Sequence, residues 1–294
     1  AEALESASVV AIGYGEVRKR DISGSVVSAD MGEIAKLPVA SVLDGVAGRI
    51  SGVQISSNDG TPGQSSNVVI RGGNSISGDN SPLYVVDGFP AENFDIGTLD
   101  PSEIESFVVL KDASATAIYG SRGANGVIVV NTKKGVASQK PIISYRGSFA
   151  VDLITKTMDM MSPYDFVAMM YERDPKTTEE TYLADKTLES YRDQVGIDWQ
   201  DKLFRPAFKH THTISIRGGN SSTKYNVSGS FLDQDGLIIT SNYKKYNVKM
   251  DLEQQLFKWL KAGVSVNYIN NTYTGAQPTV FSGHNNVANM MYYT

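Results

Sequence analysis

The sequence lacks cysteine altogether, and it lacks both an excess of positive charge and a long apolar run. Zero cysteines in 294 residues exclude disulfide frameworks, thiolate metal sites and cysteine nucleophiles. Lys+Arg 27 against Asp+Glu 32 gives a net charge of −5, so the basic face that neutralises phosphates is missing and we expect no nucleic-acid partner. No run approaches the roughly 18 apolar residues of a transmembrane helix, so a membrane span could only be made of barrel strands.

Residues suited to catalysis or metal binding are also scarce. Of the three histidines, His210 and His212 are spaced to share one face of a strand, but no third ligand has matching spacing. Residues 233–236 (DQDG) begin like a calcium loop and lack its distal glutamate. No nucleophile elbow, HExxH or Walker sequence occurs. We therefore expect no metal, no cofactor and no enzymatic activity.

The stretch from residue 107 to 130 has the densest structural signals. Phe107–Leu110 is a short apolar run that fits a buried strand, and Val127–Val130 is a second one. Between them, Asp112 can cap a short helix and Gly120 can take the left-handed conformation that ends it. This pattern predicts strand, short helix, tight turn and strand.

Similar signals flank this stretch. Ser41 can cap a helix that Gly48 ends, and Asp100 can cap a turn in which Glu103 would return a reciprocal bond. Short strands are predicted at 53–55, 68–70 and 83–86, the last followed by the hairpin dipeptide Asp87-Gly88. Polar loops separate these strands, at 56–66, 72–81 and 89–99. Residues 25–139 are thus predicted to form a small α+β domain.

From residue 140 onward, apolar and polar residues alternate in five short segments. The segments are 143–151, 225–231, 246–253, 260–268 and, less regularly, 210–217. The alternation fits transmembrane barrel strands and also a soluble β-sandwich. Short connections (218–223, 255–258) alternate with long ones (152–209, 233–243), which favours an outer-membrane barrel with short periplasmic turns. Phe166, Met169 and Met170 have helical spacing, so the longest connection is predicted to be a folded outer loop.

Four pieces of the chain resemble, in order, the plug domain of SusC-like TonB-dependent outer-membrane transporters. They are 37–52, 67–73 (NVVIRGG), 82–88 (PLYVVDG) and 110–135 (LKDASATAIYGSRGANGVIVVNTKKG). The resemblance implies an α+β plug domain followed by antiparallel transmembrane strands of a barrel of about 22 strands. About five strands are visible, and so few cannot close a barrel in lipid. We therefore expect a fragment with three parts: a tail (1–24), the plug domain (25–139) and the first strands and outer loops (140–294).

The resemblance also implies a location in the bacterial outer membrane and TonB-dependent import. An apolar patch in the otherwise mobile tail falls where the family keeps its TonB box, a segment that pairs edge to edge with a strand of TonB. These residues are Val9, Val10, Ala11 and Ile12. A surface lipoprotein like SusD and outer-membrane lipid would be further partners.

By position, three plug loops would face the ligand. Their candidate residues are Asn58, Asp59, Asn74, Ser75, Ser77, Asp79, Asn80, Phe89, Glu92, Asn93 and Phe94. Directional hydrogen bonds and flat apolar faces suit a polyol or a peptide, and a glycan is the favoured cargo because it is the commoner one in this branch. Arg122, in a turn of small residues, is expected to be buried in the plug–barrel interface opposite an acidic wall residue.

Three alternatives remain at this stage. An oligopeptide importer would work by the same mechanism. A secreted β-rich binding or adhesion module would be water-soluble, with an N-terminal domain that only resembles a plug. A hydrolase built on a sandwich would need a pair of catalytic carboxylates, which the sequence does not show.

Overall fold

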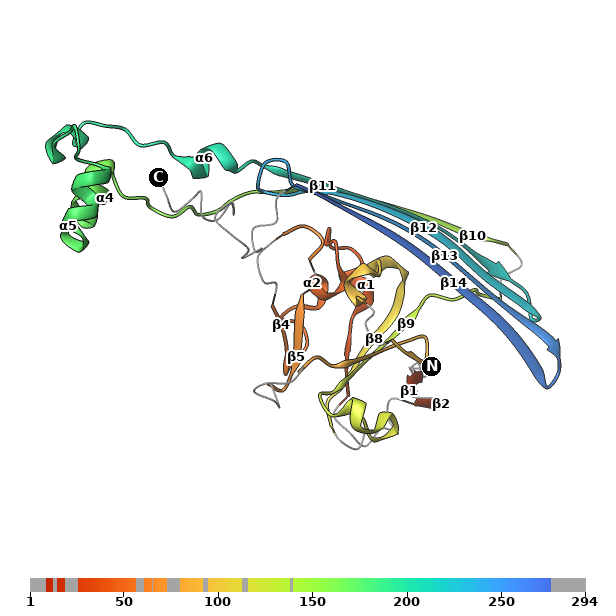
Figure 1. Cartoon of the computed structure of the whole chain (residues 1–294). Helices are drawn as coiled ribbons and strands as arrows, with labels where there is room; N and C mark the ends of the chain where they lie inside the picture. Colours follow the sequence, from red (N-terminus) through yellow and green to blue (C-terminus); the bar gives the residue numbers. More distant parts are fainter. Residues whose placement is uncertain are drawn as a thin grey trace, which may run out of the picture. The chain divides into compact units, whose positions relative to one another are not determined.

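The computed structural model describes residues 9–12, 15–18, 26–56, 61–64, 66–72, 80–91, 95–112, 116–137 and 140–275 (Figure 1). The chain forms two compact units, one of residues 1–150, 209–234 and 243–273, the other of residues 151–208, 235–242 and 274–294. Neither predicted domain boundary, after residue 24 or after residue 139, coincides with a border between these units, so both stay predictions. No helix in the described ranges is long and apolar enough to cross a membrane.

The N-terminal part of the first unit, the plug, is built on a mixed sheet with the order β3-β8-β9-β6-β7. Its strands are β3 (Val26–Ala29), β6 (Leu83–Val86), β7 (Phe89–Pro90), β8 (Ile104–Leu110) and β9 (Val127–Thr132). Strand β6 runs parallel to β9, and the other pairs are antiparallel. Asp87 and Gly88 join β6 to β7 with φ of 50° and 89°, as predicted for a hairpin dipeptide.

Short elements complete the plug. They are the pair β4 (Val53–Ser56) and β5 (Asn67–Ile70), the helices α1 (Met31–Ile34) and α2 (Val42–Val46), and the 3₁₀ turns η2 (Ile96–Thr98), η3 (Pro101–Glu103) and η4 (Ala117–Gly123). Ser41 caps α2 through a 3.1 Å bond from Leu43 N, and Gly48 follows with φ of 72°. The predicted helix after Ser41 is therefore confirmed.

Both faces of the plug sheet are buried, which explains the unbroken apolar runs in β8 and β9. Residues on one face pack with α1 and α2 in a core that includes Met31, Ile34, Leu43, Phe107, Val109, Ile128 and Val130. Residues on the other face form a second cluster of Leu83, Val85, Val108, Leu110, Val127 and Val129. The alternate residues of each run thus enter different cores.

Two local predictions differ from the structure. Residues 9–18 were expected in a mobile tail, whereas β1 (Val9–Ile12) pairs antiparallel with β2 (Gly15–Arg18). The predicted helix end at Gly120 is a kink inside η4, because Gly120 has φ of 62° and ψ of −149° and a second turn continues to Gly123. The sequence signals a glycine conformation there, but it does not say whether the chain stops or bends.

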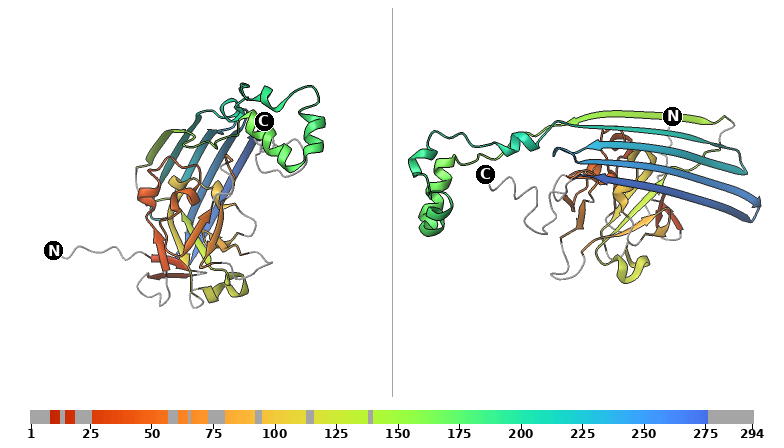
Figure 2. Two further views of the ribbon diagram at one scale, coloured as in Figure 1. Left: turned by 90° about the vertical axis from the view of Figure 1, so that its left-hand side faces the viewer. Right: turned by 45° about the horizontal axis from the view of Figure 1, so that its top comes forward.

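A second sheet, the wall, contains five strands in the order β10-β11-β12-β13-β14 (Figures 1 and 2). They are β10 (Ile142–Asp152), β11 (Ala207–Gly219), β12 (Thr223–Asp235), β13 (Asn242–Phe257) and β14 (Leu260–Thr274). Strands β11 and β12 pair antiparallel from Lys209 opposite Gln234 to Gly219 opposite Lys224. Each predicted segment is confirmed as a strand, and each strand extends beyond the alternating residues that predicted it.

The two faces of the wall are inverted relative to a water-soluble sheet. On β13 the apolar side chains of Tyr246, Val248 and Met250 are exposed, with Val248 at 54%. The polar side chains that alternate with them are buried, and Lys249 is only 3% exposed. Apolar residues outside and polar residues inside are the arrangement of a transmembrane barrel strand, so the wall matches a fragment of such a barrel.

The second unit contains most of the predicted folded loop. Its helices are α4 (Pro163–Arg173), α5 (Pro175–Thr181) and α6 (Trp199–Leu203), with the 3₁₀ turn η5 (Leu188–Tyr191). The buried amide of Gln200 exchanges two hydrogen bonds with the backbone of Met158, at 2.9 and 2.8 Å. Arg205 Nη2 donates to Asp235 Oδ1 at 3.1 Å and to Ser241 O at 3.0 Å. The prediction of a folded connection is confirmed.

Candidate functional site: the polar interface between plug and wall

One row of side chains on β13 holds the plug to the wall. Every second residue, beginning at Tyr243, turns to the plug and meets a different segment of it. The pairs are Tyr243 with Gly63, Lys245 with the Ala40 carbonyl (3.3 Å), Asn247 with Glu103 (2.9 Å) and Lys249 with Thr132. We call these four β13 residues the docking row. Because strand side chains alternate between faces, a single strand can present such a row.

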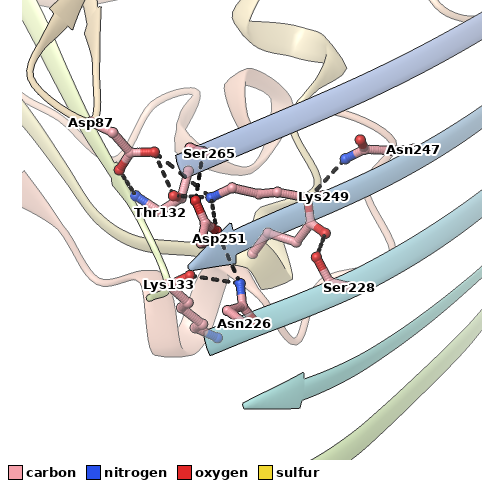
Figure 3. A network of polar contacts seen from close by, with 10 residues as sticks. Asp87, Thr132, Lys133, Asn226, Ser228, Asn247, Lys249, Asp251 and Ser265 are labelled. Carbon is pink, nitrogen blue, oxygen red and sulfur yellow. Dashed lines mark hydrogen bonds and ion pairs between the residues drawn. The ribbon is translucent and has the colours of Figure 1, made fainter. Parts of the chain in front are cut away.

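Lys249 is the most highly connected member of the docking row (Figure 3). Its ammonium donates to Thr132 Oγ1 and lies 3.7 Å from Asp87 Oδ2 and 3.1 Å from Asp251 Oδ2. An isolated charge this deeply buried would be costly, so two carboxylates compensate it, one from the plug and one from the wall.

Asp87 connects the plug's own elements at the same point (Figure 3). Its Oδ1 accepts from the backbone N–H of Thr132 at 2.8 Å, and its Oδ2 accepts from Thr132 Oγ1 at 2.6 Å. The β6–β7 turn is thereby tied to the last residue of β9. The sequence predicted only a turn role for Asp87, because local patterns do not show its long-range partners.

Asp251 organises the wall side of the network. Its Oδ1 accepts from Ser265 Oγ of β14 at 2.6 Å, and its Oδ2 lies 3.4 Å from Asn226 Nδ2 of β12. Asn226 also donates to the backbone carbonyl of Lys133 at 2.9 Å (Figure 3). Two neighbouring wall strands, β12 and β13, therefore meet the plug where β9 ends, and Asp251 ties β14 to them.

Glu103 and Asp100 make a second set of plug–wall contacts. Glu103 was predicted to close a capping box, but its carboxylate instead accepts from Ser228 Oγ and Asn247 Nδ2 of the wall. The two carboxylate oxygens of Asp100 have different partners. Oδ1 caps η3 by accepting from Ser102 N at 2.8 Å, while Oδ2 accepts from Thr213 Oγ1 of the wall at 2.7 Å. The carboxylate of Glu103 therefore bonds to donors of the wall and not to the backbone of its own turn.

Burial raises the pKa of Glu103 above its usual value. The hydrogen bond from Ser228 and the nearby charges of Lys249 and Lys245 act in the opposite direction, and Asp100 adds to the rise. Desolvation is the largest of these effects, as expected for a carboxyl group that is 5% exposed.

The expected place of Arg122 at the plug–barrel interface stays a prediction. Its side chain is exposed, and Gly123 is the buried residue of η4. In the plug–wall contacts described above, the plug contributes carboxylates from Asp87, Asp100 and Glu103, while the wall contributes Lys245, Lys249 and neutral donors.

Most of the predicted ligand loops lie outside the described residues. This applies to Asn58, Asp59, Asn74, Ser75, Ser77, Asp79, Glu92, Asn93 and Phe94. Asn80 is described and partly exposed, and Phe89 is 76% exposed. Phe89 lines a cleft of about 870 Å³ that also includes Asp87 and Lys249.

A smaller cleft, of about 280 Å³, borders two of the predicted loops. Thr61, Gly63 and Gln64 of the first predicted loop share it with Asp95 and Gly97 of the third. Wall residues complete its lining, among them Lys209, Gln234 and Tyr243. The described ends of these loops therefore lie near each other, and their contact with a ligand stays a prediction.

The remaining candidates lie apart from the docking row. The backbone of Val9, Val10, Ala11 and Ile12 forms β1, which pairs with β2 in the described part of the chain and lies beside β9. His210 and His212 lie among aromatic rings, with His212 Nδ1 2.7 Å from Tyr145 Oη and the His210 ring 5.5 Å from Phe149. No group of three or more potential metal ligands occurs among the residues described.

Comparisons with known proteins agree with this architecture. Residues 18–127 match the TonB-dependent Receptor Plug Domain family. The TonB-dependent receptor SusC of Bacteroides thetaiotaomicron is 38% identical over 270 residues, which are 89% of this chain and 26% of that protein. The TonB-dependent receptor P3 of Formosa agariphila is 37% identical over 263 residues, 89% of this chain and 24% of that protein. The chain thus spans about a quarter of the length of these relatives.

A similar solved structure is that of the RagAB peptide importer in its open-open state. The match has a TM-score of 0.76 and 30% identity, and it covers 91% of this chain and 33% of that one. The relatives are receptors and importers rather than enzymes, and TonB-dependent receptors of this type are β-barrel proteins of the outer membrane of Gram-negative bacteria. A plug domain joined to wall strands that match SusC and RagAB places this chain in the SusC-like branch of the TonB-dependent receptors.

Proposed function

We propose that this chain supplies the plug and first wall strands of a TonB-driven importer that brings a nutrient across the outer membrane. The observation that carries the proposal is the docking row, in which polar side chains hold a plug built on its own sheet against the polar face of the wall. Polar interfaces between separately folded parts separate more readily than an apolar core does. Such a polar interface can hold the plug against the wall at rest and still let the two separate when force is applied.

Energy would enter at β1. Strand β1 pairs with β2, and among the described residues no strand pairs with its other edge, which we propose as the place where a strand is added. Strand addition needs backbone N–H and C=O groups rather than particular side chains. TonB is the partner proposed for this edge, and a SusD-like lipoprotein is the partner proposed at the cell surface.

An oligosaccharide is the proposed cargo. The polar clefts and the Asn, Asp and Ser of the predicted loops suit hydroxyl groups, and Phe89 offers an exposed aromatic face. A peptide cargo is the second candidate, favoured by the similarity to a structure described as a peptide importer. The secreted binding module has no comparable support, because both the sequence and the fold match TonB-dependent receptors.

The test is energy-dependent uptake by the complete receptor, expressed with its TonB and its neighbouring lipoprotein. Cells are given a fluorescent mixture of neutral oligosaccharides or, in parallel, a fluorescent mixture of tryptic peptides. We expect oligosaccharide accumulation that Val10→Pro abolishes, because proline removes a backbone donor from β1 and disfavours strand pairing at that position. Val10→Ala keeps that donor and is the matched control.

Uptake of peptides alone would favour the second cargo. Accumulation that Val10→Pro leaves unchanged, or accumulation that persists without TonB, would overturn the proposed mechanism.

A further inference from the structure

Lys249 is the only member of the docking row that bonds to the plug and also forms an ion pair within the wall, among the contacts of the described residues. Its plug partners belong to two segments, the Asp87 turn and the end of β9, and these are already bonded to each other. One wall side chain therefore fixes two plug elements at one point.

This point is also an anchored end of β9, the strand that lies beside β1. Strand β1 lies beside β9, and β9 ends at Thr132, which Lys249 and Asp87 hold. Tension applied to β1 and passed to β9 would reach the wall at Lys249. The other docking-row residues hold Gly63, Ala40 and Glu103, which lie outside β9.

We propose that Lys249 is a positioning residue whose bridge to Asp87 and Thr132 keeps the resting plug closed, and that this bridge must open when β1 is pulled. The inference rests on the proposed function and adds to it the contact at which the plug is held. Its physical basis is the buried charge: when the plug end moves, the ammonium of Lys249 keeps Asp251 and loses Asp87. That loss makes opening unfavourable until work is done on the plug.

The bridge can be tested without cargo or TonB, by hydrogen–deuterium exchange on the complete receptor in detergent. The amides to follow are those of Asp87, which donates to Val130 O, and of Thr132, which donates to Asp87. Exchange of such amides reports how often the local structure opens. We expect Lys249→Met to speed their exchange roughly tenfold, which corresponds to about 1.4 kcal/mol of lost coupling.

Three further variants separate the bridge from general damage. Lys249→Arg keeps the charge and should restore slow exchange. In the double variant Asp87→Asn, Lys249→Met, these amides should exchange no faster than in the worse single variant, since both changes remove the same Lys249–Asp87 ion pair. Lys244→Met is the matched control: Lys244 lies on the same strand and pairs with Asp233 at 3.2 Å, but its side chain is 45% exposed.

Unchanged exchange in Lys249→Met would overturn the proposal, and so would equally fast exchange in Lys249→Arg. Exchange in β8 is the internal standard, because a rise there would mean that the plug core has loosened. The result is independent of the uptake test: a receptor that keeps this bridge yet imports nothing would refute the proposed function and leave the bridge intact.

Discussion

Gly63 packs against the ring of Tyr243 so closely that no side chain fits between them. A Cβ added at Gly63 would lie 2.5 Å from Cδ2 of the tyrosine, and Gly63 has φ of 72°. Gly48 has the same φ and no atom within 4 Å of an added Cβ. Both positions therefore favour glycine because of the positive φ, but only Gly63 also needs glycine because a side chain there would collide with Tyr243.

Gly63→Ala should destabilise the docked plug more than Gly48→Ala does. Both variants bear the cost of a positive φ, about 1 kcal/mol, while only Gly63→Ala also displaces the ring of Tyr243, for which overpacking costs about 1–3 kcal/mol. Thermal unfolding of the receptor in detergent micelles measures both. Equal destabilisation would show that the Gly63–Tyr243 contact is loose.

Thr213→Val should weaken the interface at Asp100. The change keeps the side-chain shape and removes the donor to Asp100 Oδ2, leaving a buried carboxylate oxygen without its wall partner, at a cost of about 1–3 kcal/mol. Thr211→Val is the control, since Thr211 turns to the same face of β11. Chemical denaturation of the two variants compares them, and an equal effect would contradict the assigned bond.

The stability of the docked plug should depend on pH through Glu103. Because burial raises the pKa of Glu103 in the folded state, its contribution to stability is fully present below the pKa of the unfolded chain, about 4.3. That contribution is lost as pH rises through the raised value. Glu103→Gln cannot titrate and should flatten this part of the profile.

Melting temperatures collected from about pH 4 to pH 7 provide the measurement for Glu103. The matched control is Glu105→Gln, which changes an exposed carboxylate two residues away and should leave the profile unaltered. A Glu103→Gln profile as steep as that of the unmodified protein would assign the pH dependence to other groups.

Arg205→Met should loosen residues 236–241 in the second unit. Arg205 donates to Asp235 Oδ1, Ser241 O and, at 3.2 Å, Gly236 O, so one guanidinium holds both ends of this turn. Limited proteolysis should cleave the turn several-fold faster in the variant, because cleavage follows the population of the open form.

Arg192→Met is the control for that experiment. Arg192 forms an ion pair with Glu189 at 2.8 Å, but both side chains are more than half exposed, and such pairs add little. Similar cleavage rates in the two arginine variants would mean that Arg205 does not order the turn.

Much of the fold followed from local patterns that the sequence carries in full. The unbroken apolar run of β8 predicts a strand buried on both faces, and the Asp87-Gly88 dipeptide predicts the hairpin that forms. Strict alternation along β13 assigned its lysines and asparagine to an interior face before any partner was known. These signals work because strand side chains have a period of two and because few residues adopt positive φ.

The local patterns failed where a side chain could choose between a near and a distant partner. Glu103 has the spacing of a capping box, yet it bonds to Asn247, which lies 144 positions away.

The sequence by itself determined the two kinds of sheet, the turn at Asp87 and the polar character of the inner wall face. Only the tertiary structure decided that Asp87, Asp100 and Glu103 of the plug meet Lys249, Thr213 and Asn247 of the wall. The reason is physical: backbone geometry and side-chain period act over a few residues, whereas a buried charge is compensated by whichever opposite charge the folded chain brings within about 4 Å.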